Sequence, residues 1–86
     1  MHELSLALEV CRIAEAQVGA GRAADIVEVG VEVGDDSGVE PESLTFCLEV
    51  LLSEPPFGRA RPVLERRPGD VLRVSHLEVD EGAPDG

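Results

Sequence analysis

Aromatic residues are almost missing from the sequence, and this narrows the kinds of site that the chain can build. Only Phe46 and Phe57 are aromatic, and there is no tryptophan or tyrosine. The core must therefore consist of valine, leucine, isoleucine and alanine, and a wide pocket lined by aromatic rings is not expected. With 86 residues, the chain has room for one domain with a marginal core.

Basic residues are also scarce: 7 stand against 18 acidic ones, and the net charge is −11. Such a surface repels phosphate backbones, so we expect no nucleic acid and no anionic membrane among the partners. It attracts cations and basic protein surfaces. Solubility alone explains the charge equally well.

Sequence signals for disulfides, for export and for catalysis are lacking as well. The two cysteines, Cys11 and Cys47, are far apart, each lies in an apolar helical pattern, and neither belongs to a CxxC pair. No run of about eighteen apolar residues exists, and Glu9 and Arg12 interrupt the early apolar stretch, so we expect neither a signal peptide nor a membrane span, but a cytoplasmic protein. Without a phosphate loop, GxSxG or HExxH motif, an enzyme is not expected.

The pattern of apolar residues predicts five elements. Apolar positions three and four residues apart predict a helix over 4–18, which Gly19 ends. Alternation predicts a strand over 26–33, with Val27, Val29, Val31 and Val33 on one face. A second helix follows, with Pro41 in its first turn and Pro55-Pro56 after its end, and its apolar positions extend to Phe46 and Val50.

The last part of the chain predicts a hairpin. We expect a strand over 60–67 at the edge of the sheet because of Pro62, a turn at Pro68-Gly69, and a strand over 71–79 with a bulge near Ser75-His76. In that hairpin Leu64 and Leu72 lie on paired strands. The expected fold class is α/β: a two-layer domain with two helices on a three-stranded sheet, in the order α-β-α-β-β. It covers residues 1–79, and residues 80–86 form an acidic flexible tail.

The N-terminal Met1-His2 dipeptide is the strongest candidate for chemistry. It places the α-amine, the His2 amide and the His2 imidazole in sequence, and these three nitrogens close two adjoining chelate rings on a metal ion. A deprotonated amide suits square-planar nickel(II) or copper(II) better than tetrahedral zinc. Histidine follows the initiator methionine in many unrelated proteins, so the dipeptide alone is weak evidence.

The sequence resembles the HypA/HybF family, whose members are nickel-insertion accessory proteins of [NiFe]-hydrogenase maturation. The resemblance rests on four stretches in order: Met1-His2-Glu3-Leu4-Ser5-Leu6-Ala7, residues 29–34, residues 39–51, and residues 69–74 with 77–79. It implies that Met1, His2 and Glu3 hold nickel transiently, and that Glu40 lies beside the metal or ligates it occasionally. Helix-end electrostatics is the plainer explanation for Glu3 and Glu40, and His76 is not expected at the metal.

The family also carries a zinc-binding insertion with two CxxC pairs between its last two strands. Here Glu65-Arg66-Arg67-Pro68 runs directly into Gly69-Asp70, so we expect a form without the insertion and without structural zinc. The resemblance implies a metallochaperone that passes nickel to the hydrogenase large subunit with a nickel-insertion GTPase. The alternative is an adaptor of the same machinery that keeps the fold but carries no nickel. Whether the protein forms a homodimer stays open.

Overall fold

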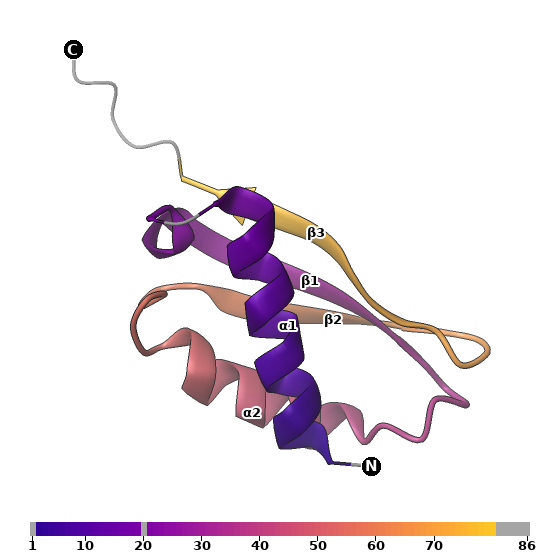
Figure 1. Ribbon diagram of the computed structural model, residues 1–86. Coiled ribbons are helices and arrows are strands. Elements are labelled where there is room, and N and C mark those ends of the chain that lie inside the picture. The colour runs from indigo at the N-terminus through magenta and orange to yellow at the C-terminus, as the bar shows by residue number, and fades with distance from the viewer. Residues whose placement is uncertain (1, 20, 81–86) are drawn as a thin grey trace.

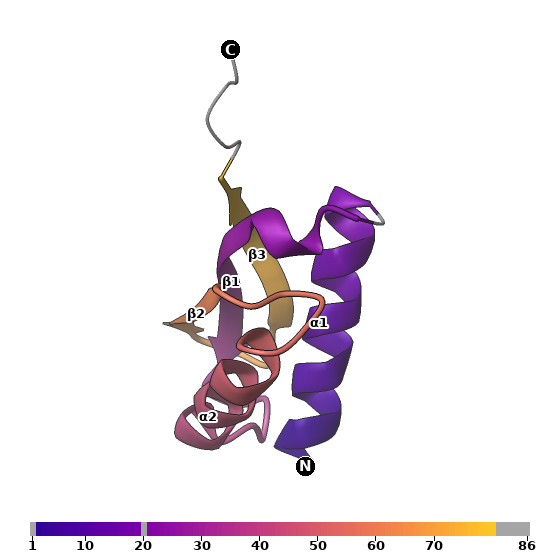
Figure 2. The ribbon, with the colours of Figure 1, turned by 90° about the vertical axis from the view of Figure 1, so that its left-hand side faces the viewer.

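The computed structural model describes residues 2–19 and 21–80, and it has the expected two layers. Helix α1 spans Glu3–Val18, a short 3-10 turn spans Ala23–Asp25, and strand β1 spans Ile26–Gly34. Helix α2 spans Pro41–Leu52, strand β2 spans Arg61–Arg67, and strand β3 spans Leu72–Val79. Both helices lie on one face of the sheet, and the other face carries no helix of the described chain (Figures 1 and 2). The expected α/β class and the order α-β-α-β-β are confirmed.

The connection of the last two strands differs from the expected hairpin. The sheet order is β2-β1-β3: β1 pairs in parallel with β2 on one side and antiparallel with β3 on the other. Leu64 therefore lies opposite Val31 and Leu72 opposite Val33, and the expected pairing of Leu64 with Leu72 is wrong. In the observed order β1 pairs its backbone on both edges, and its Val29, Val31 and Val33 are at most 1% exposed. A hairpin of β2 and β3 would leave one edge of β1 without a partner strand.

The residues after β2 cross the end of β1 instead of making a tight turn. Gly34 N donates to Val71 O at 2.6 Å, Asp35 N to Arg67 O at 2.8 Å, and Asp36 N to Gly69 O at 2.7 Å. Flanking strands lie about 10 Å apart, two interstrand spacings, and a connection of four residues reaches about 13 Å. The Pro68-Gly69 segment is therefore long enough for either topology, and its sequence does not decide between them.

The core lies between the sheet and the helices, but both helices are less covered than their apolar patterns predicted. Helix α1 buries Ala7, Val10, Cys11 and Ala14, whereas Leu4 and Leu8 are about half exposed. Helix α2 buries Leu44, Leu48 and Leu52, whereas Phe46 and Val50 stay exposed. Each helix has the sheet beneath it and only one other helix beside it. Apolar residues on the remaining side of each helix are therefore exposed to solvent.

Three local predictions fall on the strands. The bulge near Ser75-His76 is confirmed, because the register shifts where Gly30 faces His76 and Val31 faces Val74. The edge position of Pro62 is confirmed. The expected alternation of β1 is wrong at its start: Ile26 is buried and Val27 is partly exposed, since a second irregularity lies between Ile26 and Glu28. Of the expected tail, residues 81–86 lie outside the described residues.

Candidate functional site at the start of the first helix

His2 is the last residue before α1, and its imidazole is exposed. Its backbone is extended (φ −95°, ψ 101°), and its carbonyl accepts the first helical hydrogen bond, from Leu6 N at 3.2 Å. The imidazole does not cap the helix and makes no hydrogen bond or ion pair with the part of the chain that the structure describes. Because the first amides of a helix have no acceptor in the preceding turn, the His2 amide is also outside the helical ladder.

Glu3 connects the start of α1 to the start of α2. Its Oε2 accepts a hydrogen bond from the backbone N–H of Glu40 at 2.9 Å, and Glu40 is the N-cap residue of α2. This hydrogen bond is the main reason that the pKa of the Glu3 carboxyl lies below its ordinary value. The two helix starts lie close together in Figure 1, although 37 residues separate them along the chain.

The structure thus brings Glu3 and Glu40 together, but through the Glu40 backbone. Two positive helix ends meet here, and Glu3, Glu40 and Glu42 supply the negative charge that favours such an arrangement. Glu3 Oε2 is already an acceptor, and Oε1 is the oxygen left for a further contact. The remaining predicted ligand, Met1, lies outside the residues that the structure describes.

Clusters of three or more metal-binding side chains are absent from the described residues, and the start of α1 is no exception. Within residues 2–19 and 21–80, no group of three or more His, Cys, Asp or Glu side chains could hold a metal ion. Cys11 is buried in α1, which raises the pKa of its thiol to about 11, and Cys47 is partly exposed in α2. Neither cysteine therefore adds a side-chain ligand to a cluster with His2, Glu3 or Glu40 within the described residues.

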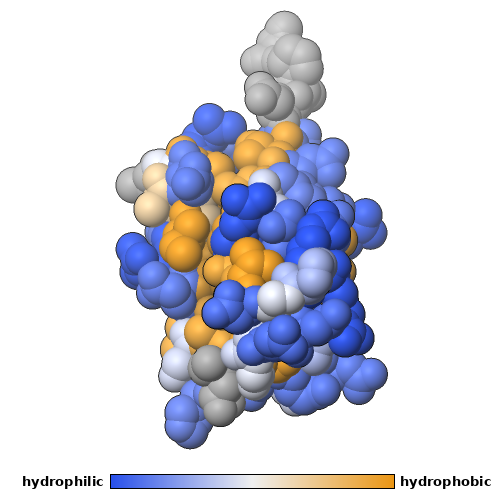
Figure 3. All heavy atoms as spheres, turned by 90° about the vertical axis from the view of Figure 1, so that its right-hand side faces the viewer, coloured by the Kyte–Doolittle hydropathy of each residue, from blue (hydrophilic) through white to orange (hydrophobic). Residues whose placement is uncertain are grey.

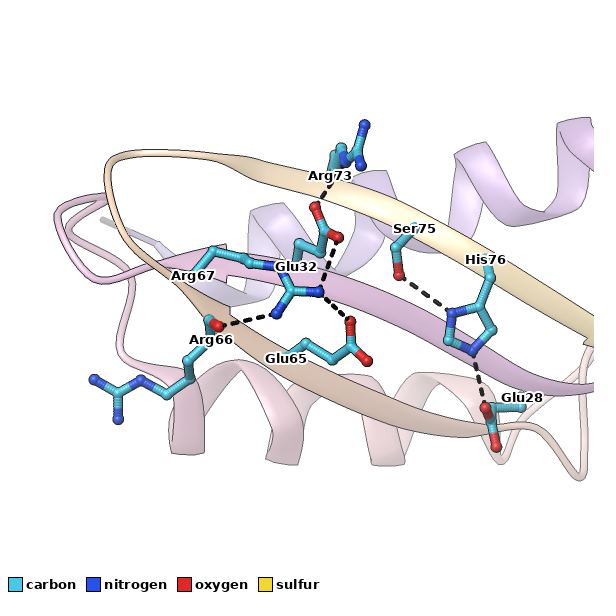
Figure 4. Close-up of polar contacts among 8 residues, drawn as sticks. All are labelled: Glu28, Glu32, Glu65, Arg66, Arg67, Arg73, Ser75 and His76. Atoms are coloured by element: carbon cyan, nitrogen blue, oxygen red, sulfur yellow. Dashed lines mark hydrogen bonds and ion pairs between the residues drawn. The ribbon is translucent and has the colours of Figure 1, made fainter.

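His76 lies away from this site, on the helix-free face of the sheet (Figure 4). Its Nε2 lies 2.9 Å from Glu28 Oε2, and its Nδ1 lies 3.2 Å from Ser75 Oγ. The ring covers Gly30, where an added Cβ would come within 2.1 Å of its Cε1. The hydrogen bond from His76 is the largest cause of the lowered pKa of Glu28.

A second set of ion pairs occupies the same face and was not foreseen from the sequence. Glu32 accepts from Arg73 Nε at 2.8 Å and lies 3.5 Å from Arg67 Nη2 (Figure 4). The hydrogen bond from Arg73 is the main cause of the lowered pKa of Glu32. The available signal was the alternation of Glu28, Gly30 and Glu32 along β1, which predicted a polar face but not the partners on β2 and β3.

Comparison with known proteins agrees with the sequence resemblance. The model of the family described as "Hydrogenase/urease nickel incorporation, metallochaperone, hypA" matches residues 1–74. Hydrogenase maturation factor HypA of Geobacter metallireducens is 39% identical over 69 residues, which are 80% of this chain and 60% of that protein. HypA of Albidiferax ferrireducens is 35% identical over 79 residues, 92% of this chain and 70% of that protein.

The chain spans only part of these relatives. The matches to HypA of Geobacter metallireducens and of Desulfosudis oleivorans, the latter 32% identical over 69 residues, each cover 60% of the relative. Among the described residues, neither helix has the length and hydropathy needed to cross a bilayer. The family match nevertheless covers the helix starts and most of the sheet, so the chain belongs to the HypA family of nickel-incorporation metallochaperones.

Proposed function

We propose that this domain binds one nickel(II) ion at its N-terminus, as cargo for hydrogenase maturation. The donors are the Met1 amine, the His2 amide and the His2 imidazole, with a further backbone amide or a water completing a mostly nitrogen set. The observation that carries the proposal is the position of His2. It precedes α1, and neither its amide nor its imidazole is used by the described part of the fold. A donor set of this kind suits nickel(II) or copper(II).

Glu3 and Glu40 act beside the metal in this proposal. The hydrogen bond from Glu40 N to Glu3 Oε2 fixes the first turn of α1 against α2 and thereby fixes the place from which His2 projects. The Glu3 carboxylate also offsets the positive helix ends next to a bound cation. Glu3 therefore belongs to the site mainly through its hydrogen bond, with its Oε1 facing the metal as an occasional ligand.

Nickel is then passed to a [NiFe]-hydrogenase large subunit in the cytoplasm, with a nickel-insertion GTPase as partner, and the protein itself catalyses no reaction. Membership of a nickel-incorporation family supports this role. An open site with few side-chain ligands suits transfer, because the ion must leave as well as bind. The competing function is an adaptor of the same machinery that holds no nickel.

Nickel titration of the untagged chain tests the proposal. Wild type should bind one nickel per chain, whereas His2→Ala and a variant with residues added before Met1 should lose most of the affinity. The control His76→Ala changes the other histidine and should bind like wild type. Affinity should fall as pH drops, because protons compete with nickel for the amine, amide and imidazole nitrogens.

The pair Glu3→Gln and Glu3→Ala separates the two roles of Glu3. Glutamine keeps a side-chain acceptor for Glu40 N, so Glu3→Gln should retain nickel binding if positioning is the role, while Glu3→Ala should weaken it. Equal loss in both variants would make the carboxylate itself a ligand. Equal nickel affinity in wild type, His2→Ala and the extended variant would exclude the N-terminal site and leave the adaptor function.

A further inference from the structure

Strand β3 is an edge strand whose outer side pairs with no strand of the described chain. The sheet order β2-β1-β3 places its inner side on β1 and leaves eight residues, Leu72–Val79, with one open edge. An open edge presents unpaired backbone N–H and C=O groups, which are a template for another strand. The identity of that strand follows from the side chains of β3.

The residues of β3 are complementary to themselves in the antiparallel direction. With a two-fold axis between Ser75 and His76, three kinds of pair repeat on each side of it: Leu72 with Val79, Arg73 with Glu78, and Val74 with Leu77. An isologous contact needs this property, since each residue meets the same partner twice. Apolar residues meet apolar ones, and each arginine meets a glutamate.

The faces of the sheet also match in this register. Through their partners on β1, Leu72, Val74, Leu77 and Val79 belong to the helix-covered face, and Arg73, His76 and Glu78 to the open face. The bulge at Ser75-His76 lies at the two-fold axis. The change of alternation that it causes therefore falls at the same place in both copies, and residues at equal distances from the axis lie on the same face. Each of the three pairs therefore consists of two residues on the same face, as cross-strand pairs require.

The charged pairs have groups available for a second copy. Arg73 uses its Nε for Glu32, so its terminal guanidinium nitrogens can reach a further carboxylate. Glu78 is exposed and makes no ion pair with another described residue. The other edge strand, β2, offers no comparable match, because Pro62 lacks an N–H and Arg61, Arg66 and Arg67 give it mainly one sign of charge.

The apolar side of β3 is incompletely covered within one chain. Leu72, Val74, Leu77 and Val79 all remain partly exposed, in contrast to the valines of β1. A hollow of about 320 Å³ between α1 and β3 is lined by Gln17 and residues 74–77. Leu6 and Ile13, on the same side of α1 as Gln17 by helical spacing, are also partly exposed.

Apolar patches lie between charged side chains on the side of the molecule to which the β2–β3 connection points (Figure 3).

We propose that two copies of this chain associate through their β3 strands into one six-stranded sheet, with the two α1 helices on the same face. The interface uses none of His2, Glu3 and Glu40, so it is independent of the proposed nickel site.

Charge reversal combined with sedimentation analysis tests the dimer. Wild type should sediment as a dimer, whereas Glu78→Arg and Arg73→Glu should each be monomeric, because each places like charges opposite one another twice. An equal mixture of the two variants should form a heterodimer, since both of its charged cross-strand pairs again join an arginine to a glutamate. The double variant should also be a dimer. The matched control, Glu49→Arg, makes the same change in net charge as Glu78→Arg but on α2, and it should leave the dimer intact.

Folding defects do not imitate this pattern, because a misfolded variant is not rescued by mixing it with another. Nickel binding should be unchanged in Glu78→Arg, so this proposal and the nickel site fail separately. A wild-type monomer at concentrations up to the millimolar range would overturn the proposal. So would a Glu78→Arg variant that dimerises like wild type, or a mixture of the two single variants that does not associate.

Discussion

Gly34 is where the observed topology can be tested most directly. A Cβ added here would lie 2.3 Å from Gly69 O and 2.6 Å from Val71 N. Both atoms are backbone, so neither can rotate away, and Gly34→Ala must push the β2–β3 connection off the end of β1. Three backbone hydrogen bonds join residues 34–36 to that connection, and each contributes about 1 kcal/mol net.

We therefore expect Gly34→Ala to lower the free energy of unfolding by about 3 kcal/mol. A chain of this length is stable by roughly 4–13 kcal/mol, so the loss corresponds to a fall of roughly 12–24 °C in melting temperature. Urea unfolding followed by far-UV circular dichroism suits a chain without tryptophan or tyrosine.

Gly30→Ala is the matched control for this measurement. Gly30 is another buried glycine of β1, but the three atoms nearest to its added methyl all belong to the imidazole of the exposed His76. That side chain can swing aside, so a much smaller loss of stability is expected. Equal stability of Gly34→Ala and wild type would refute the crossing connection, because in a β2–β3 hairpin residues 69–71 would not cross Gly34.

Four further measurements test other parts of the description. Leu48 is fully buried and Val50 is 43% exposed, so Leu48→Ala should cost about 2–5 kcal/mol and Val50→Ala within about 0.5 kcal/mol in the same unfolding assay. Iodoacetamide at mildly alkaline pH should modify Cys47 well before Cys11, whose thiol has its pKa raised to about 11 by burial; equal rates in the folded protein would contradict the burial. Elemental analysis after mild chelation should give far less than one zinc per chain, because a structural site needs about four Cys or His ligands; one retained zinc per chain would point to a site shared between chains. The hydrogen bond from Glu40 N lowers the pKa of Glu3 in the folded state, so the stability difference between wild type and Glu3→Ala should be largest at neutral pH and shrink as pH falls below the ordinary glutamate range, and a difference independent of pH would argue against that bond.

Local elements could be read from the sequence because their signals are short-range. Gly19 has φ 92° at the end of α1, and Pro41 is in the first turn of α2, as the spacing of these residues predicted. The bulge in β3 was visible as a break in alternation at Ser75-His76. Each of these features depends on backbone preferences within a few residues.

Strand order could not be predicted from the sequence, because it depends on which strand becomes the central one when the sheet packs against the helices. Val29, Val31 and Val33 alternate with polar residues, as an edge strand or a central strand would. Only the packed structure shows that Glu28 and Glu32, on the opposite face, are covered by His76 and by Arg67 and Arg73. The two partner strands contribute these side chains from opposite sides of β1, which a hairpin of β2 and β3 would not allow.

The candidate metal site was foreseen only in part, for the same reason. His2 and Glu3 were singled out from the sequence and the family resemblance. The contact that positions them, from Glu40 N to Glu3 Oε2, joins residues 37 apart. The expectation that Glu40 lies beside the metal stays a prediction, and the contact that Glu40 makes with Glu3 uses its amide. The first amides of a helix have no acceptor within the helix, so they are free to bond a side chain of another helix. The spacing of residues in the sequence does not show which two helix starts will lie close enough to do so.

The segment between β1 and α2, residues 35–40, contacts both the β2–β3 connection and the first turn of α1. Its first residues, Asp35 and Asp36, donate to backbone oxygens at the β2–β3 connection, which is the place where the resemblance implies that the family carries its zinc-binding insertion. Its last residue, Glu40, donates its backbone N–H to Glu3. Ser37 braces the segment from within, since its Oγ donates to Gly34 O at 2.7 Å and accepts from Val39 N at 3.3 Å. An insertion between β2 and β3 would therefore leave the sheet directly beside the segment that positions the start of α1. The short β2–β3 connection and the first turn of α1 are consequently joined through one segment, by hydrogen bonds from the backbone amides of Asp35, Asp36 and Glu40.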